Sequence, residues 1–139
     1  MTAAARETSV TQTAAKVTAE WAPTAGRVLL GLVLAWFGYH ELIQPTLWTG
    51  YVPVIQPTST SAIILVLVHG WILLVLAVAL VAGVATGAAA GVAALALAQI
   101  VIWLMATAGL SDLTLRDVGV LGLALCIAGA ARQRFALSS

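Results

Sequence analysis

A run of fifty residues without a formal charge, residues 61–110, limits what this chain can fold into. A membrane-crossing helix needs about 20 consecutive apolar residues, so this run is long enough for two crossings and too long for one. Over the whole chain 62% of the residues are hydrophobic and 8% are charged. Soluble domains carry about 25% charged residues. The sequence therefore predicts an all-α protein of the lipid bilayer.

Helix-breaking residues divide the apolar sequence into four expected spans. Pro45 ends the first apolar run, glycines at residues 83 and 87 supply a turn inside the uncharged run, and residues 111–114 are polar. The expected spans are about residues 27–43, 61–84, 87–110 and 115–131. They predict an up-down bundle over residues 25–132. The uncharged loop 44–60 is expected to lie on the membrane surface, because Trp48 and Tyr51 are aromatics typical of the headgroup boundary.

The two ends of the chain are expected to be short tails on the cytoplasmic side. Residues 1–24 have no sustained apolar face and are expected to be flexible, and residues 133–139 follow the last span. Short cytoplasmic loops carry an excess of Lys and Arg. One end of the predicted bundle has Arg6, Lys16, Arg27, Arg132 and Arg134, and the other has Arg116 beside two aspartates. We therefore expect a multi-pass protein of the plasma membrane with both termini in the cytoplasm.

Steps of three and four residues place small side chains along one side of two spans, which favours close helix packing in lipid. The span-one stripe is Arg27, Gly31, Leu34, Gly38 and Glu41. The span-four stripe is Arg116, Gly119, Gly122, Cys126 and Gly129. If the two stripes face each other, Glu41 and Arg116 meet at the outer end. They would then form either an ion pair that fixes helix register or an anion contact at Arg116 with Glu41 as proton acceptor.

Four further polar residues have a structural interpretation, and one of them, His69, also has a functional one. His69 and Gln99 lie at similar depths in neighbouring spans, so they are expected to bond each other, unless His69 serves a ligand. Thr114 and Asp117 have the spacing of a capping box at the start of the fourth span.

Aromatic residues in the spans are most often packing or interface residues, but they could also line a flat apolar pocket. A quinone ring suits such a pocket, because its faces stack and its oxygens accept hydrogen bonds from a His or Arg. The candidate ligand site is Trp36, Tyr39, Glu41, His69, Gln99, Trp103 and Arg116.

Several classes of function are not expected. The net charge of +1 offers no basic surface for nucleic acid, and a single cysteine cannot form an internal disulfide. No His and Cys cluster has the spacing of a metal site. Haem is not expected either, because His40 and His69 would lie at mismatched depths.

The order of several short motifs resembles that of DoxX-like membrane proteins. They are residues 27–31 (RVLLG), 36–42 (WFGYHEL) and 48–53 (WTGYVP), then His69-Gly70 and residues 115–119 (LRDVG). The resemblance covers about residues 27–131 and implies a four-helix bundle in the plasma membrane. Relatives in that family include the DoxD subunit of a thiosulfate:quinone oxidoreductase, so the resemblance implies a possible link to quinone redox chemistry.

The leading functional expectation is a small membrane subunit that supports quinone-linked electron transfer. Such a chain would act as an accessory of an oxidoreductase rather than as a complete enzyme, with a redox partner subunit or further copies of itself beside it in the bilayer. The alternatives are a non-enzymatic assembly or scaffold protein and a permease for a small solute.

Overall fold

The computed structural model describes the backbone of residues 3–130 and the side chains of residues 12–130. The four helices in this range are α1 (Ala3–Ile43), α2 (Thr60–Ala82), α3 (Thr86–Ala108) and α4 (Asp112–Gly129). The loop after α1 contains two short 3-10 helices, η1 (Pro45–Leu47) and η2 (Thr49–Tyr51). Strands are absent from the described range, so the predicted all-α class is confirmed.

Three of the helices are long and apolar enough to cross a membrane: α2, α3 and the part of α1 from Gln12 to Ile43. The helices α2 and α3 have 23 residues each. At 1.5 Å per residue each is about 35 Å long, which exceeds the hydrocarbon core of about 30 Å. With 18 residues, α4 is shorter and carries three ionisable residues in its first six.

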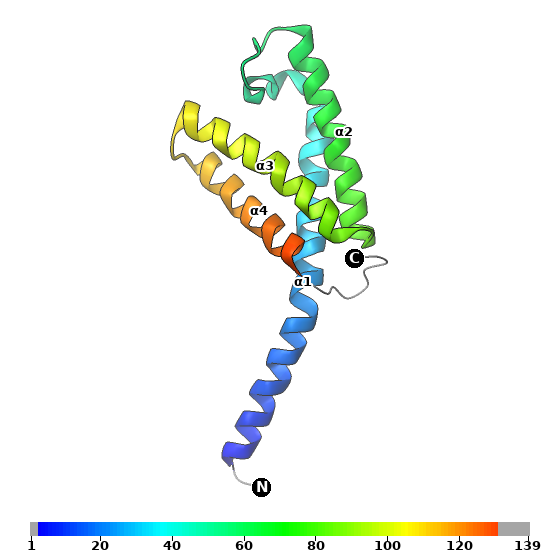
Figure 1. Ribbon diagram of the computed structural model, residues 1–139, viewed down its shortest axis with the longest axis vertical. Helices are drawn as coiled ribbons and strands as arrows, with labels where there is room; N and C mark the ends of the chain where they lie inside the picture. The colour runs from blue at the N-terminus through cyan, green and yellow to red at the C-terminus, as the bar shows by residue number, and fades with distance from the viewer. Residues whose placement is uncertain (1–2, 131–139) are drawn as a thin grey trace.

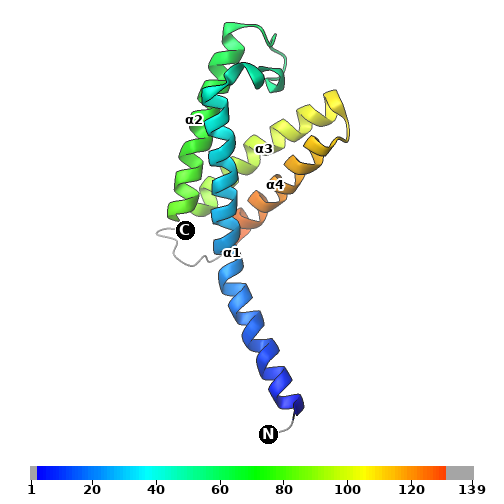
Figure 2. The ribbon, with the colours of Figure 1, turned by 180° about the vertical axis from the view of Figure 1, so that it is seen from behind.

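The helices form two hairpins. α1 packs mainly against α2, and α3 packs mainly against α4 (Figure 1). The view from behind shows the same arrangement, with the α3–α4 hairpin diverging from α1 and α2 toward the turn between α3 and α4 (Figure 2). We call this end of the bundle, which also carries the loop 44–59, the loop end. The opposite end, with the turn between α2 and α3, is the turn end.

Glycine allows α1 and α2 to approach each other closely. A Cβ atom added at Gly38 would lie 2.7 Å from the carbonyl oxygen of Gly70, and one added at Gly70 would lie 3.0 Å from that of Gly38. Both contacts are with backbone, which cannot rotate away. Leu34 and Leu73 are buried beside this crossing. The span-one stripe is therefore the buried face of α1, as its small residues predict.

The turn between α2 and α3 lies where the sequence predicts it. Gly83 ends α2 in the left-handed region (φ 79°), and its N–H donates to the carbonyls of Ala79 and Leu80. α3 then begins at Thr86. Glycine is favoured at such a position because it has no Cβ to clash.

The predicted capping box of α4 is wrong. The helix begins three residues earlier, at Asp112, and Ser111 is its N-cap, with Oγ accepting from the N–H of Thr114 at 3.2 Å. Thr114 lies in the first turn and donates its hydroxyl to the carbonyl of Gly109. A serine cap followed by an acid in the first turn suits the helix dipole, so the earlier start is the better one.

The segment expected to be a flexible tail is helical from Ala3 onward. α1 continues past the bundle as a single helix, through Pro23, and extends well beyond the turn end (Figures 1 and 2). Residues 3–24 contain many alanines, which have the highest helix propensity. The span already provides the costly first turn, so adding further residues requires propagation alone. The predicted C-terminal tail, residues 133–139, lies outside the described residues.

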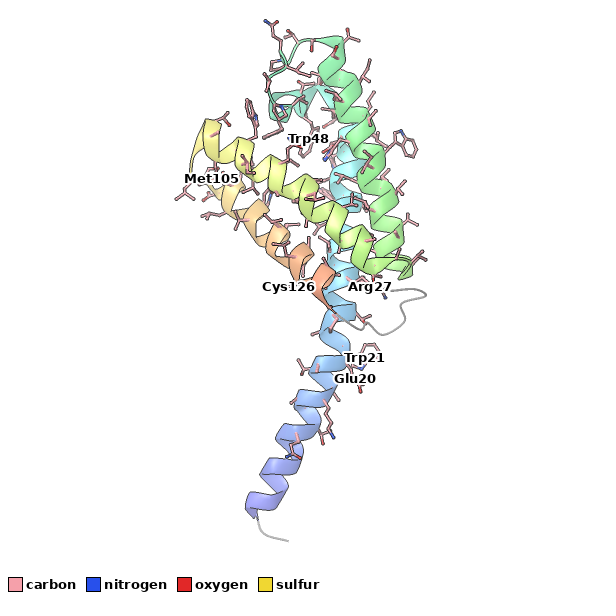
Figure 3. The ribbon with its side chains drawn as sticks, viewed as in Figure 1. Glu20, Trp21, Arg27, Trp48, Met105 and Cys126 are labelled. Carbon is pink, nitrogen blue, oxygen red and sulfur yellow. The ribbon has the colours of Figure 1, made fainter. Side chains whose placement is uncertain are left out.

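Apart from Arg116, the span-four stripe does not pack against the rest of the described chain. Gly119, Gly122, Cys126 and Gly129 are exposed, and Cys126 faces away from the bundle on the outer side of α4 (Figure 3). The buried face of α4 is formed by Thr114, Asp117, Ala124 and Ile127. Ile127 packs against Gly26 of α1. The contact of α4 with α1 is therefore made by this larger apolar side chain and not by the small residues of the stripe. The two stripes therefore do not face each other.

Candidate functional site

A cavity of about 260 Å³ lies between the two hairpins at the loop end. This is near the lower end of the size of small-molecule sites, about 300–1,000 Å³. All four helices and the loop after α1 line it. Most of the lining is apolar, including Leu34, Val66, Leu73, Leu97 and Val120. The polar side chains that line it are Glu41, Gln99, His69, Arg116 and Asp117, together with Trp48 and Tyr51.

Glu41 and His69 are hydrogen-bonded across the α1–α2 contact. Nδ1 of His69 lies 2.8 Å from Oε2 of Glu41, and the side chains are 28% and 8% exposed. Glu41 is one turn from Gly38, and His69 is next to Gly70. The close glycine crossing therefore brings the carboxylate and the imidazole within hydrogen-bond distance.

The second ring nitrogen of His69, Nε2, has no hydrogen-bond partner among the described residues. This atom is also buried. A buried polar atom without a partner is rare in native proteins and calls for an explanation, such as a bound ligand. Because Nδ1 is held by Glu41, Nε2 is the ring nitrogen without a partner among the described residues, and His69 itself lines the cavity.

Arg116 and Asp117 line the cavity from α4. Nε of Arg116 donates to Oδ1 of Asp117 at 2.8 Å, and its guanidinium lies 4.8 Å from the centroid of the Phe37 ring. The side chain of Arg116 is 45% exposed. The pairing with Asp117 leaves this side of the cavity with little net charge.

Two predicted pairs are therefore wrong. Glu41 pairs with His69 and not with Arg116, and His69 does not bond Gln99. The cause is helix packing. α2 lies mainly on α1 rather than on α3, which brings His69 to Glu41, and Arg116 bonds its neighbour Asp117. A carboxylate is also a stronger acceptor for an imidazole N–H than a neutral amide is. Gln99 and Arg116 still line the cavity, so the structure brings four of the predicted site residues to one place.

The aromatic part of the predicted site is different in the structure. Trp36 and Tyr39 are 64% and 55% exposed on the outer face of α1, where both contact the ring of His40. Neither they nor Trp103 line the cavity.

The aromatic residues of the cavity are Phe37, Trp48 and Tyr51. Trp48 lies between the loop and the outer parts of the helices (Figure 3) and contacts Phe37 edge-on at 5.7 Å between ring centroids. The loop therefore contributes to the lining of the cavity through Trp48 and Tyr51, and its expected place on the membrane surface stays a prediction. The spacing of Phe37, three residues after Leu34 and four before Glu41, was a signal that it shares their face.

A second buried charge lies near the turn end. Arg27 is 3% exposed, and Nε and Nη1 have no hydrogen-bond partner within residues 3–130. In Figure 3, Arg27 lies near the turn between α2 and α3, far from Trp48. Arg27 does not line the cavity and is not part of the site.

No group of three or more His, Cys, Asp or Glu residues that could hold a metal ion occurs in the searched part of the chain. His40 lies outside the cavity, and its Nδ1 is 2.8 Å from the carbonyl oxygen of Trp36.

Comparison with known proteins gives no relative. The chain matches no protein-family model, no curated protein and no solved structure. The residues of the site offer an apolar space, aromatic faces for stacking, and hydrogen-bonding groups on opposite sides, His69 with Glu41 on one and Arg116 with Asp117 on the other.

Proposed function

We propose that this chain is a small membrane subunit of the DoxX-like kind that binds a quinone between its two hairpins. The observation that carries the proposal concerns His69, which lines the apolar cavity. Its Nε2 is buried and has no hydrogen-bond partner among the described residues. A quinone has a flat apolar ring, which can stack on Phe37 or Trp48, and carbonyl oxygens, which accept hydrogen bonds from His69 and Arg116. In this proposal the chain positions the quinone, and a redox partner subunit supplies or removes electrons.

The proposal includes a plasma-membrane topology of four spans with both termini in the cytoplasm. Two observations support it. Most Lys and Arg residues lie in the segments that precede the first span and follow the last one. The described bundle also has an even number of α-helices. The cavity then lies toward the outer leaflet, where a lipid-soluble quinone could enter from the bilayer.

Chemical labelling tests this topology. In a Cys126→Ser background, a Thr58→Cys variant is expected to react with a membrane-impermeant thiol reagent on intact cells, because residue 58 lies in the loop 44–59. A Ser138→Cys variant is expected to react only after the membrane is opened. The reverse pattern would contradict the topology, and labelling of both sites on intact cells would contradict an even number of spans.

Quinone binding to the purified chain tests the function. Decylubiquinone is added to the protein in mild detergent, and the bound amount is measured after the free quinone has been removed. An Ala96→Phe variant places a ring into the cavity, because Ala96 lines it. Binding is expected to fall at least about tenfold, which corresponds to about 1.4 kcal/mol.

A matched variant on the same helix controls for general effects. Leu95 is 75% exposed on the outside of α3, next to Ala96. Leu95→Phe is therefore expected to bind quinone as the unchanged protein does. Binding that is equal in all three proteins would place the quinone in the detergent or on the surface and would refute the cavity as its site.

A second candidate function, membrane assembly, is favoured by the outward-facing span-four stripe. At Gly119, Gly122 and Gly129 an added Cβ would meet no atom within 4 Å in the described chain. Small residues on a lipid-facing surface allow another helix to approach closely. A protein that co-purifies in fixed ratio with the unchanged chain but not with a Gly122→Leu variant would favour this candidate.

A further inference from the structure

The Glu41–His69 pair can exist in two protonation states that present opposite faces to a ligand. With one proton on the pair, Nδ1–H donates to the carboxylate, and Nε2 carries a lone pair that accepts a hydrogen bond. With a second proton the ring is an imidazolium, and Nε2–H becomes a donor.

These two states match the two forms of a quinone. A quinol has hydroxyl groups, which donate to a lone pair. A quinone has carbonyl oxygens, which accept from an N–H. The other charged groups that line the cavity are Arg116 and Asp117, and they are paired with each other. Glu41 and His69 are therefore the ionisable residues of the cavity that adjust most directly to the form of the ligand.

We propose that the Glu41–His69 pair is the proton-exchanging group of this cavity, and that it holds one more proton in the quinone complex than in the quinol complex. This proposal rests on the proposed quinone site. In the quinone complex, Nε2–H of His69 donates to a carbonyl oxygen of the ring. In the quinol complex, Nε2 accepts from a hydroxyl group. Glu41 remains a carboxylate in both and holds Nδ1–H.

Proton counting during ligand binding tests the proposal without any electron transfer. Decylubiquinone and, under anaerobic conditions, decylubiquinol are titrated separately into the full chain in weakly buffered detergent near neutral pH. A pH-indicator dye reports the protons taken up or released, and the bound ligand is measured in parallel. The two ligands are expected to differ by about one proton per bound molecule, because binding is linked to the protonation of the pair.

Three variants locate that proton. The amide of Glu41→Gln has nearly the same shape as the carboxylate, and it can hold a neutral imidazole without an extra proton. The difference in proton uptake between the two ligands is therefore expected to vanish, while quinone still binds. In His69→Phe the difference is expected to vanish and binding to weaken. His40 is the matched control, since it lies on α1 outside the cavity, and His40→Gln is expected to keep the full difference.

The outcomes separate the two proposals. If neither ligand binds, the quinone site itself is refuted, and the pair's role falls with it. If both bind with equal proton uptake or release, the quinone site stands and the proton-exchanging role of the pair is overturned. The role is also overturned if Glu41→Gln keeps the full difference, because the proton would then reside elsewhere.

Discussion

Replacing Gly38 with leucine is expected to separate α1 from α2 and to destabilise the protein. Even the first carbon of the new side chain would lie 2.7 Å from the carbonyl oxygen of Gly70 and 3.1 Å from Leu73. Overpacking of this kind costs about 1–3 kcal/mol and sometimes more. Thermal unfolding in mild detergent should show a lower midpoint, and quinone binding should weaken because Glu41 and His69 move apart.

The control for this change lies on α4. At Gly122 an added Cβ would have no neighbour within 4 Å in the described part of the structure. Alanine is a better helix former than glycine, so Gly122→Ala is expected to leave stability unchanged or to raise it by about 0.5–1 kcal/mol. If Gly38→Leu unfolded at the same temperature as Gly122→Ala, the close glycine crossing would not exist.

A double-mutant cycle on Glu41 and His69 is expected to show strong coupling. Losing one partner leaves the other poorly paired, which costs about 3–5 kcal/mol for a buried ion pair. Interhelical hydrogen bonds in membranes contribute about 0.6–2 kcal/mol. Because His69 is 28% exposed and Glu41 is 8% exposed, the loss for each alanine variant should lie between these ranges. The double variant should lose less than the sum of the two single losses.

The same cycle on two other pairs is the control. Glu41 with Arg116 and His69 with Gln99 are both plausible pairs by sequence, but neither pair is bonded in the structure. All four side chains line one cavity, so these pairs are not fully independent, but their coupling energies should be clearly smaller than that of the hydrogen-bonded Glu41–His69 pair. Strong coupling of Glu41 to Arg116, with none to His69, would contradict the arrangement of the cavity.

The sequence was sufficient for those features that depend on residues close together in the chain. Helical class, the break at Gly83 and the loop after Ile43 follow from apolar run length and from helix-breaking residues, which act locally. The burial of the span-one stripe also followed from local spacing, because its glycines and Leu34 lie at steps of three and four. The helical extension of α1 was not predicted, because residues 3–24 have no sustained apolar face, and the helix there is favoured by alanine propensity instead.

The partners of the polar residues were decided by tertiary structure. The span-one and span-four stripes look alike in sequence, yet one is buried and the other faces outward. Which face of α4 turns inward depends on how Ile127 and Ala124 fit against α1 and α3, and a single-helix pattern holds no information about that fit.

The same reasoning explains the cavity. The sequence alone determined that Glu41, His69, Gln99 and Arg116 are ionisable or polar groups among apolar helices, where such groups need partners. Their pairing was set by the glycine crossing of α1 and α2, which brings Glu41 to His69 instead of to Arg116. Contacts between residues 28 positions apart depend on helix orientation and approach distance, and these are properties of the packed bundle rather than of any one segment.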